Sequence, residues 1–390
     1  MEIDIINKSF EKLKEYCEIS GFKGYDPYDG LNSEILSSFI YLKKSHFFRL
    51  CWIQLFKKSP INLRNIALVK KDINPKAMGI FLSAYCEIYK NNKSDDTLNK
   101  VNFFIEKIYL LKNKNYSGAC WGYNFDWQSR AFFQPKNTPN IVTSSFIANS
   151  LLDAYNITGD NKLLDVARST CDFIIKDLNI NEDKYGNKAF SYSPLDKSIV
   201  YNASLLGARL LSRVYSITQE NILYDFSKSA VDYCCNMQNK NGSWTYGKLP
   251  FHQWIDNFHT GYNLECISDY TNYTQDNSVS KNLSNGFDYY INTFFLKDGK
   301  CKYYSNKIYP IDIHAPAQLI ITLNKLKKLD AYKDTVDNVI KWTIKNMQSK
   351  KGFFYYQVNK IITNKIPYMR WSQAWMLYSL SIYFNHLNKT

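Results

Sequence analysis

Two short stretches of the sequence place an aspartate just ahead of a histidine. In WIDNFH, Asp256 precedes His259 by three residues, and in YPIDIHAPAQ, Asp312 precedes His314 by two. An aspartate beside a histidine can orient the imidazole and support its charge during proton transfer. The structural alternative is that each aspartate only caps a helix, because Asp ahead of a helix accepts its free N–H groups. For Asp256 alone the two interpretations are balanced, and they do not exclude one another.

Pro316 indicates where the helix after Asp312 and His314 begins. Proline is tolerated in the first turn of a helix and poorly tolerated deeper in, so we expect a helix to begin near Ala315. Asp312 and His314 would then lie just outside that helix. This makes Asp312 a weaker cap candidate than Asp256 and leaves both side chains free to act on a ligand.

A repeat organises the elements that must position these residues. Five segments join a small residue to an aromatic residue and a tyrosine: GACWGYNFDWQ, GNKAFSYSPLD, NGSWTYGKLPF, DGKCKYYSNKI and KGFFYYQVNKI. Helix-like stretches alternate between apolar nearly all round and amphipathic. The apolar helices are predicted to begin near residues 75, 139, 201, 258, 315 and 370. The amphipathic helices are predicted near 94, 160, 220, 278 and 331.

A helix that is apolar all round belongs inside, and an amphipathic helix belongs outside. Twelve helices in that alternation predict an all-α fold, an (α/α)6 toroid, with an open superhelical repeat as the alternative. We expect residues 1–390 to form one toroid domain, in which residues 75–390 supply the repeated hairpins. Residues 1–70 show no repeat. We expect residues 31–57 to supply the outer partner of the last inner helix and the N-terminal helix to close the ring.

Parallel inner helices would bring the aromatic segments together at one mouth of the ring. The catalytic candidates expected there are Asp126, Asp256, His259, Asp312, His314 and Arg370. The substrate-binding candidates are Trp121, Trp127, Gln128, Arg130, Tyr192, Asn202, Trp244, Tyr246, Trp254, Asn257, Gln318, Trp371 and Gln373. Each has a structural alternative as a cap, an ion-pair partner or packing. Their recurrence in corresponding loops favours a site.

This set of residue types is typical of a carbohydrate site. Sugars stack on Trp and Tyr faces, while carboxylates and amides bind their hydroxyl groups. Two carboxylates across a cleft could hydrolyse a glycosidic bond. A Tyr, His and Arg set could instead abstract the proton next to a uronate carboxylate, as lyases and epimerases do. No dense ligand spacing indicates a metal, so neither a metal nor another cofactor is expected.

Composition limits the partners and the compartment. The net charge of +14 favours acidic partners, but the basic residues are dispersed and predict no nucleic-acid ligand. The nine cysteines form no CxxC pair, which favours small core residues in a reducing compartment. The N-terminus lacks a signal-peptide core, and no stretch reaches the roughly 20 apolar residues of a membrane span. A cytoplasmic protein is therefore expected, with an oligosaccharide or polysaccharide as its partner.

Several motifs, in order, resemble the VpsJ-like polysaccharide-biosynthesis proteins of bacteria: WGYNFDWQSR, TPNIVTSSF, GSWTYG, WIDNFHTGY, YPIDIHAPAQ and YMRWSQAW. The resemblance spans roughly residues 110–380. More distantly, the chain resembles six-hairpin glycosidase and terpenoid-cyclase-type toroids. The resemblance implies an α/α toroid that works on exopolysaccharide or capsule.

Three functions stay open at this point. The leading one is an enzyme acting on an acidic glycan intermediate of surface-polysaccharide synthesis, by hydrolysis, β-elimination or epimerisation. The second is a non-catalytic glycan-binding or scaffold subunit. The third is an isoprenoid-handling toroid, which is disfavoured because the chain lacks a DxDD motif and a clear Asp/Cys/His zinc set.

Overall fold

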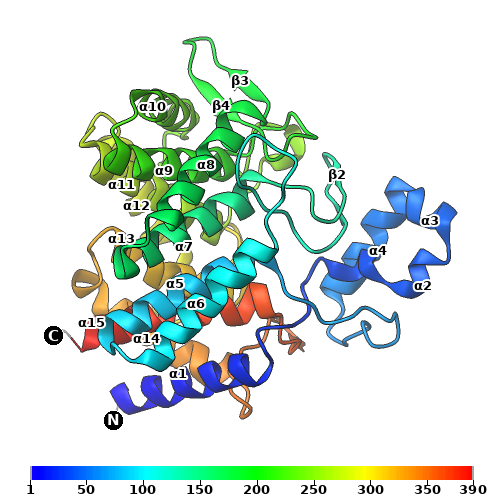
Figure 1. Ribbon diagram of the computed structural model, residues 1–390. Coiled ribbons are helices and arrows are strands. Elements are labelled where there is room, and N and C mark those ends of the chain that lie inside the picture. The colour runs from blue at the N-terminus through cyan, green and yellow to red at the C-terminus, as the bar shows by residue number, and fades with distance from the viewer. Residues whose placement is uncertain (1, 389–390) are drawn as a thin grey trace.

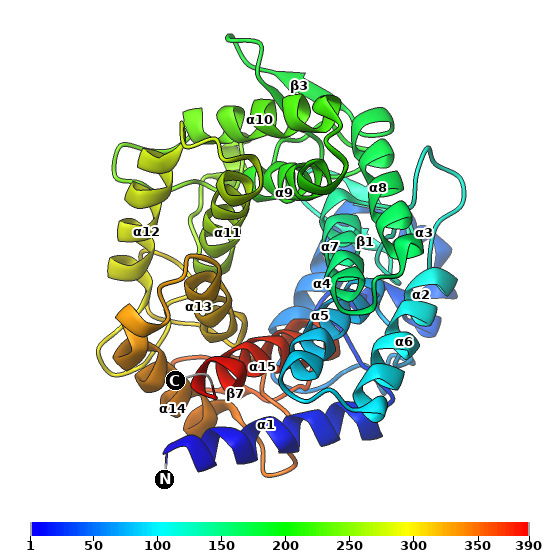
Figure 2. The same cartoon turned by 60° about the vertical axis from the view of Figure 1, so that its left-hand side comes forward.

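The computed structural model describes residues 2–388, and within them six inner helices form a closed ring (Figure 2). These helices are α5 (Pro75–Asn91), α7 (Ile141–Thr158), α9 (Tyr201–Thr218), α11 (Asn257–Thr274), α13 (His314–Lys325) and α15 (Trp375–Leu387). Each packs against the next, and α15 packs back against α5. The predicted all-α toroid is therefore confirmed, and the open superhelix is excluded.

A second layer of helices covers the ring from outside. It consists of α1 (Glu2–Ile19), α6 (Asp95–Leu110), α8 (Asn161–Lys176), α10 (Asn221–Asn236), α12 (Ser280–Phe294) and α14 (Lys333–Met347). Helix α8 shows why such helices stay outside. It buries one stripe, which includes Leu163, Ala167 and Cys171, while the inner helix α7 buries nearly every side of its first four turns.

The expectation for the N-terminal region was wrong in one respect. The outer partner of α15 is α1, not residues 31–57. Helix α1 buries Ile6, Phe10, Leu13 and Cys17, a spacing that forms one apolar stripe. Residues 29–58 break into short pieces instead, which are η1 (Asp29–Asn32), α2 (Glu34–Ser37), α3 (Ile40–Lys44) and α4 (His46–Lys58). Helices α2, α3 and α4 stand off the ring at one end (Figure 1).

Short side chains set where several inner helices begin. Asn74, Asn140 and Asp256 occupy the N-cap positions of α5, α7 and α11, and each side chain accepts a hydrogen bond from a backbone N–H of the first turn. Helix α13 begins at His314, one residue before the expected start, with Pro316 in its first turn. A π-helical segment, η4 (Met369–Ala374), leads directly into α15.

The connections carry short antiparallel strands. Strand β1 (Trp127–Gln128) pairs with β2 (Phe133–Gln134), and β3 (Ile180–Glu182) pairs with β4 (Lys188–Phe190). Strand β6 (Gln357–Val358) lies between β5 (Ile311–Asp312) and β7 (Thr363–Asn364). The pairing of Asp312 with Gln357 joins the loop before α13 to the loop before η4. Two short 3-10 turns, η2 (Pro250–His252) and η3 (Asp330–Tyr332), complete the connections.

Candidate functional site

A cavity of about 1290 Å³ lies where the inner helices begin. The first turns of α5, α7, α9, α11 and α13, and of the η4 segment that leads into α15, contribute to its lining through Lys76, Val142, Asn202, His259, His314 and Arg370. This common end of the ring is called the mouth below. Because the helices begin at the same mouth, their side chains converge on one volume, which is large enough for more than one sugar unit.

The structure brings most of the predicted binding residues to this cavity. Those that line it are Trp127, Gln128, Arg130, Tyr192, Asn202, Tyr246, Trp254 and Trp371. Of the six catalytic candidates, His259, His314 and Arg370 line it, and the three aspartates do not. The imidazoles and the guanidinium therefore lie at the cavity surface, and the carboxylates do not.

His259 is held by a carboxylate behind it. Its Nδ1 lies 2.8 Å from Oδ2 of Asp256, and its backbone N–H donates to Oδ1 of the same residue at 2.9 Å. Asp256 is almost fully buried, whereas the His259 side chain keeps about a fifth of its surface exposed. With Nδ1 engaged, Nε2 is the nitrogen left to exchange a proton with a ligand.

His314 is buried in an aromatic shell beside His259. Its Nε2 lies 2.8 Å from the hydroxyl oxygen of Tyr262. Phe258 contacts both imidazoles, with ring centroids 4.0 Å from His259 and 4.5 Å from His314. Burial, together with the charges of Lys76, His259 and Arg370, holds the pKa of His314 well below its ordinary value. The His314 imidazole is therefore neutral, and its Nε2 is engaged by the Tyr262 hydroxyl.

Asp312 does not stand free at the mouth. Its Oδ1 accepts hydrogen bonds from the backbone N–H of His314 and from Nε1 of Trp371, both at 2.9 Å. Its Oδ2 accepts from Nε2 of Gln357 at 2.6 Å. Burial raises the pKa of this carboxyl to about 6. In this structure Asp312 braces three segments around His314.

Asp126 also lies beside the cavity. Its Oδ1 accepts from the backbone N–H of Lys136 at 2.8 Å, and its Oδ2 lies 3.3 Å from Nζ of Lys43. These contacts tie the loop before α7 to the short helix α3. Asp126 thus holds the rim of the mouth together.

Two charged residues at the site were not foreseen. Asp26 makes two hydrogen bonds to the Arg370 guanidinium, at 2.5 and 2.8 Å, so Arg370 is neutralised from behind. Lys76 is buried, and its Nζ lies 4.3 Å from the centroid of the Phe146 ring. Burial and the charge of Arg370 hold the pKa of Lys76 well below its ordinary value. Asp26 was missed because residues 1–70 carry no repeat that would place it at the mouth. Tyr262, the partner of His314, was also missed, although it lies one helical turn after the candidate His259.

Aromatic rings form much of the cavity wall. Tyr246 stacks on Trp254 with centroids 4.3 Å apart, and Trp127 packs against Tyr192 at 5.5 Å. The Tyr123 and Tyr192 hydroxyls lie 3.0 Å apart. Flat faces with polar edges suit the alternating apolar and hydroxyl surfaces of a sugar.

Five predicted binding residues do not line the cavity: Trp121, Trp244, Asn257, Gln318 and Gln373. Each has a structural partner instead. The Trp121 and Trp244 indoles donate to backbone carbonyls of α6 and α10. The Gln373 side chain bonds both backbone groups of Phe354. Asn257 accepts from the Tyr290 hydroxyl, and Gln318 bonds Glu265.

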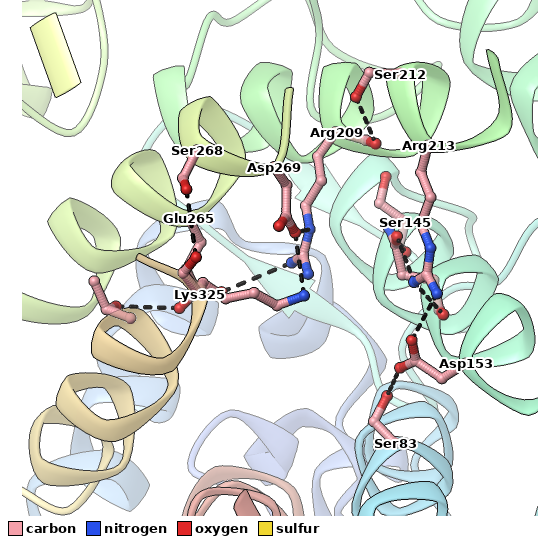
Figure 3. A network of polar contacts seen from close by, with 12 residues as sticks. Ser83, Ser145, Asp153, Arg209, Ser212, Arg213, Glu265, Ser268, Asp269 and Lys325 are labelled. Carbon is pink, nitrogen blue, oxygen red and sulfur yellow. Dashed lines mark hydrogen bonds and ion pairs between the residues drawn. The ribbon is translucent and has the colours of Figure 1, made fainter. Parts of the chain in front are cut away.

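A charged network occupies the ring further along the inner helices (Figure 3). Arg209 pairs with Asp269 at 2.7 Å and lies 3.7 Å from Glu265. Arg213 pairs with Asp153 at 2.8 Å. Burial raises the pKa of Glu265 to about 7. These side chains come from neighbouring inner helices, so the network joins α7, α9 and α11 inside the ring.

The charged side chains of the cavity lining are all basic ones. The lining contains Lys57, Lys58, Lys76, Arg130, Lys307, Lys360 and Arg370, and among the described residues no Asp or Glu lines it. Within residues 2–388, no group of three His, Cys, Asp or Glu side chains is placed to hold a metal ion. No helix in that same range is both long and apolar enough to cross a bilayer.

Comparison with known proteins gives the fold. No family model matches this chain, and no curated protein matches it. Among solved structures, an unsaturated glucuronyl hydrolase specific for heparin is 12% identical and covers 100% of this chain and 98% of its own, with a TM-score of 0.66. The cellobiose 2-epimerase of Bacillus thermoamylovorans B4167 is 14% identical, covering 82% and 88%, with a TM-score of 0.63. A D-mannose isomerase is 12% identical, covering 81% and 87%, with a TM-score of 0.60.

At these identities the likeness shows a shared fold. It agrees with the distant resemblance to six-hairpin toroids. The likeness to VpsJ-like proteins stays a prediction from the sequence.

Proposed function

We propose that this chain is a carbohydrate-active enzyme that moves a proton on an acidic sugar, with His259 and His314 as the proton-transfer groups. The observation that carries this proposal is the cavity lining, in which two neighbouring imidazoles face the ligand volume and no carboxylate does. Epimerisation, isomerisation and β-elimination all begin by removing a C–H proton, and a histidine is well suited to that task.

In this mechanism His259 removes or returns the proton through Nε2. Asp256 keeps Nδ1–H oriented and stabilises the imidazolium that forms. His314 and Tyr262 both line the cavity and are hydrogen-bonded to each other, so His314 serves as the second proton-transfer group through the Tyr262 hydroxyl. Proton removal leaves negative charge on the sugar, and the basic side chains of the lining stabilise that charge.

Hydrolysis is the weaker reading of the same site. Glycoside hydrolysis typically uses two carboxyl groups that flank the scissile bond. Asp256 and Asp312 are turned to their own hydrogen bonds behind the lining, and Asp126 is tied to the rim. Structural likeness to an epimerase, an isomerase and a hydrolase is compatible with each reaction and does not choose between them. The choice of proton transfer rests on the residues that line the cavity.

Arg370 is paired with Asp26 and the pKa of Lys76 is lowered, so the other five basic side chains of the lining, Lys57, Lys58, Arg130, Lys307 and Lys360, are the ones that support an acidic substrate such as a uronate-containing oligosaccharide. The setting in surface-polysaccharide synthesis rests on the sequence resemblance. A cytoplasmic location rests on the sequence alone.

Deuterium incorporation tests the proposal directly. Wild type and His259→Gln are incubated in D2O with a panel of neutral hexoses, cellobiose, uronates and uronate oligosaccharides, and exchange of sugar C–H positions is followed by NMR. We expect exchange with at least one acidic sugar, and about a 10²–10⁴-fold loss in the variant. His386→Gln, at the far end of α15, is the matched control.

The products separate the possible reactions. A new epimer or ketose containing deuterium means epimerisation or isomerisation, and an unsaturated uronate means elimination. Saturable binding without any exchange or cleavage would instead support the glycan-binding alternative and overturn the proposed chemistry.

A further inference from the structure

Strongly exposed apolar side chains gather around the mouth. The short helices α2, α3 and α4 project from the ring there (Figure 1). Phe39, Ile40, Tyr41, Leu42 and Phe47 are all exposed on this projection. A soluble surface usually scatters such side chains singly, so a group of this size indicates an interaction site.

The apolar residues of helix α3 are not explained by packing within the protein. It spans Ile40–Lys44, and none of its residues is buried. Tyr41 is 88% exposed, and the apolar run is followed at once by Lys43 and Lys44. Four consecutive apolar residues therefore face solvent without contributing to the core, and Lys44 beside them is exposed as well.

The same combination recurs in other segments of the mouth. Ile308 follows Lys307, and Ile361 and Ile362 follow Lys360; all three isoleucines are exposed, Ile361 by 91%. Lys307, Lys360, Ile361, Ile362 and Phe47 also line the cavity. The three segments thus surround one opening, and we call residues 39–47, 307–308 and 360–362 the apolar–basic rim.

Hydrogen bonds hold the rim segments in place. Asn364, just after the 360–362 turn, donates from Nδ2 to the backbone carbonyl of Ser59 at 2.9 Å. Arg49 of α4 donates from Nε to Oε1 of Gln128 at 2.8 Å. The projection is thereby fixed to the loops before α7 and η4, so its apolar residues keep their position beside the cavity.

Charge selects the partner of this surface. Glu34 of α2 is already paired with Lys70, and Asp126 is paired with Lys43 of α3. Lys44, Lys58, Lys307 and Lys360 make no ion pair among those that the described residues show. A second copy docked on this rim would bring lysines against lysines. An anionic lipid surface instead accepts both the lysines and the apolar side chains between them.

We propose that the apolar–basic rim docks on an anionic membrane surface. The projecting helices have 4 to 13 residues, too few to cross a bilayer that needs about 20, so they insert only at the interface. The cavity then opens toward the lipid headgroups. Resting on the proposed function, this makes a membrane-carried saccharide the substrate class of the site.

Vesicle co-sedimentation tests the docking without any substrate. The full chain is mixed with vesicles of phosphatidylcholine alone, or of phosphatidylcholine with phosphatidylglycerol, at low and high salt. We expect binding to the anionic vesicles that weakens as salt rises. Replacing Tyr41, Ile361 and Ile362 together by Ser should reduce binding by about tenfold or more, because their insertion is lost.

Leu110→Ser, at a leucine that is 73% exposed at the end of the outer helix α6, is the control away from the rim and should bind like wild type. Equal, weak binding to both vesicle types would overturn the proposal. So would concentration-dependent dimerisation in light scattering that the triple variant abolishes, because the rim would then be an interface between copies. Since no sugar is present, either result leaves the deuterium-exchange experiment to decide the proposed function independently.

Discussion

The Asp256 carboxylate contacts His259 twice, with one oxygen on its backbone N–H and the other on its imidazole Nδ1. The first contact caps α11 at its N-terminus, and the second fixes the plane of the ring. One aspartate therefore begins the helix and orients the imidazole. Capping and support of proton transfer are compatible at this position because each uses a different oxygen.

The change Asp256→Asn separates these two roles. An amide oxygen can still cap α11, but an amide N–H facing Nδ1 would make that nitrogen an acceptor and leave the proton on Nε2. We expect a turnover loss of about 10²–10⁴-fold with little change in melting temperature. Asp160→Asn, the N-cap of the outer helix α8, should leave turnover unchanged. Near-normal turnover in Asp256→Asn would show that the carboxylate only caps the helix.

Tyr262→Phe tests the partner of His314. The change keeps the ring but removes the hydroxyl at Nε2, so the pH dependence of turnover should shift and its rate should fall. Stability should fall by about 1–3 kcal/mol, because a buried polar nitrogen loses its partner. Tyr270→Phe, on the same helix, removes a hydroxyl bonded to Asp276 and should affect stability alone. Equal turnover in the two variants would remove Tyr262 from the site.

Asp312 predicts a specific dependence of stability on pH. Its pKa is raised by burial from 3.8 to about 6, so the folded protein binds a proton that the unfolded chain releases. That contribution is complete below about pH 4 and is lost as pH rises through 6, and it is on the order of 3 kcal/mol. We expect the stability of Asp312→Asn relative to wild type to improve between pH 4 and 7. Denaturant unfolding at several pH values measures this, and a constant difference would contradict the raised pKa.

Arg209→Met probes the charged network inside the ring. The change leaves the carboxylates of Glu265 and Asp269 without one of their cations, although Lys325 lies 3.3 Å from Asp269. Losing one partner of a buried ion pair typically costs about 3–5 kcal/mol. We expect a loss of that size in denaturant unfolding at pH 8, where Glu265 is ionised, and a smaller loss at pH 5, where it is protonated. Arg168→Met, in a half-exposed ion pair on α8, should cost much less.

The sequence by itself determined the fold to within one or two residues at most inner helices. Apolar character all round marked α7 and α9 as inner helices, and one-sided polarity marked α8 and α10 as outer ones, because burial leaves a periodic record in local sequence. Pro316 indicated the start of α13 to within one residue through backbone chemistry that is equally local. Residues 31–57 misled the prediction because that segment is helical without packing on the ring.

The site was only partly readable for a different physical reason. Trp127, Trp254 and His259 line the cavity. Trp121 and Trp244 lie in the same kind of aromatic segment between helices, yet their indoles donate to backbone carbonyls and do not line the cavity. Asp312 precedes a histidine as Asp256 does, but its two carboxylate oxygens accept hydrogen bonds from Gln357 of β6 and from the Trp371 indole. Asp26 reaches Arg370 across 344 positions of the chain. Residue type and spacing predict which groups could do chemistry, and only the closed ring decides which of them face a ligand, because hydrogen bonds from distant segments compete for each one.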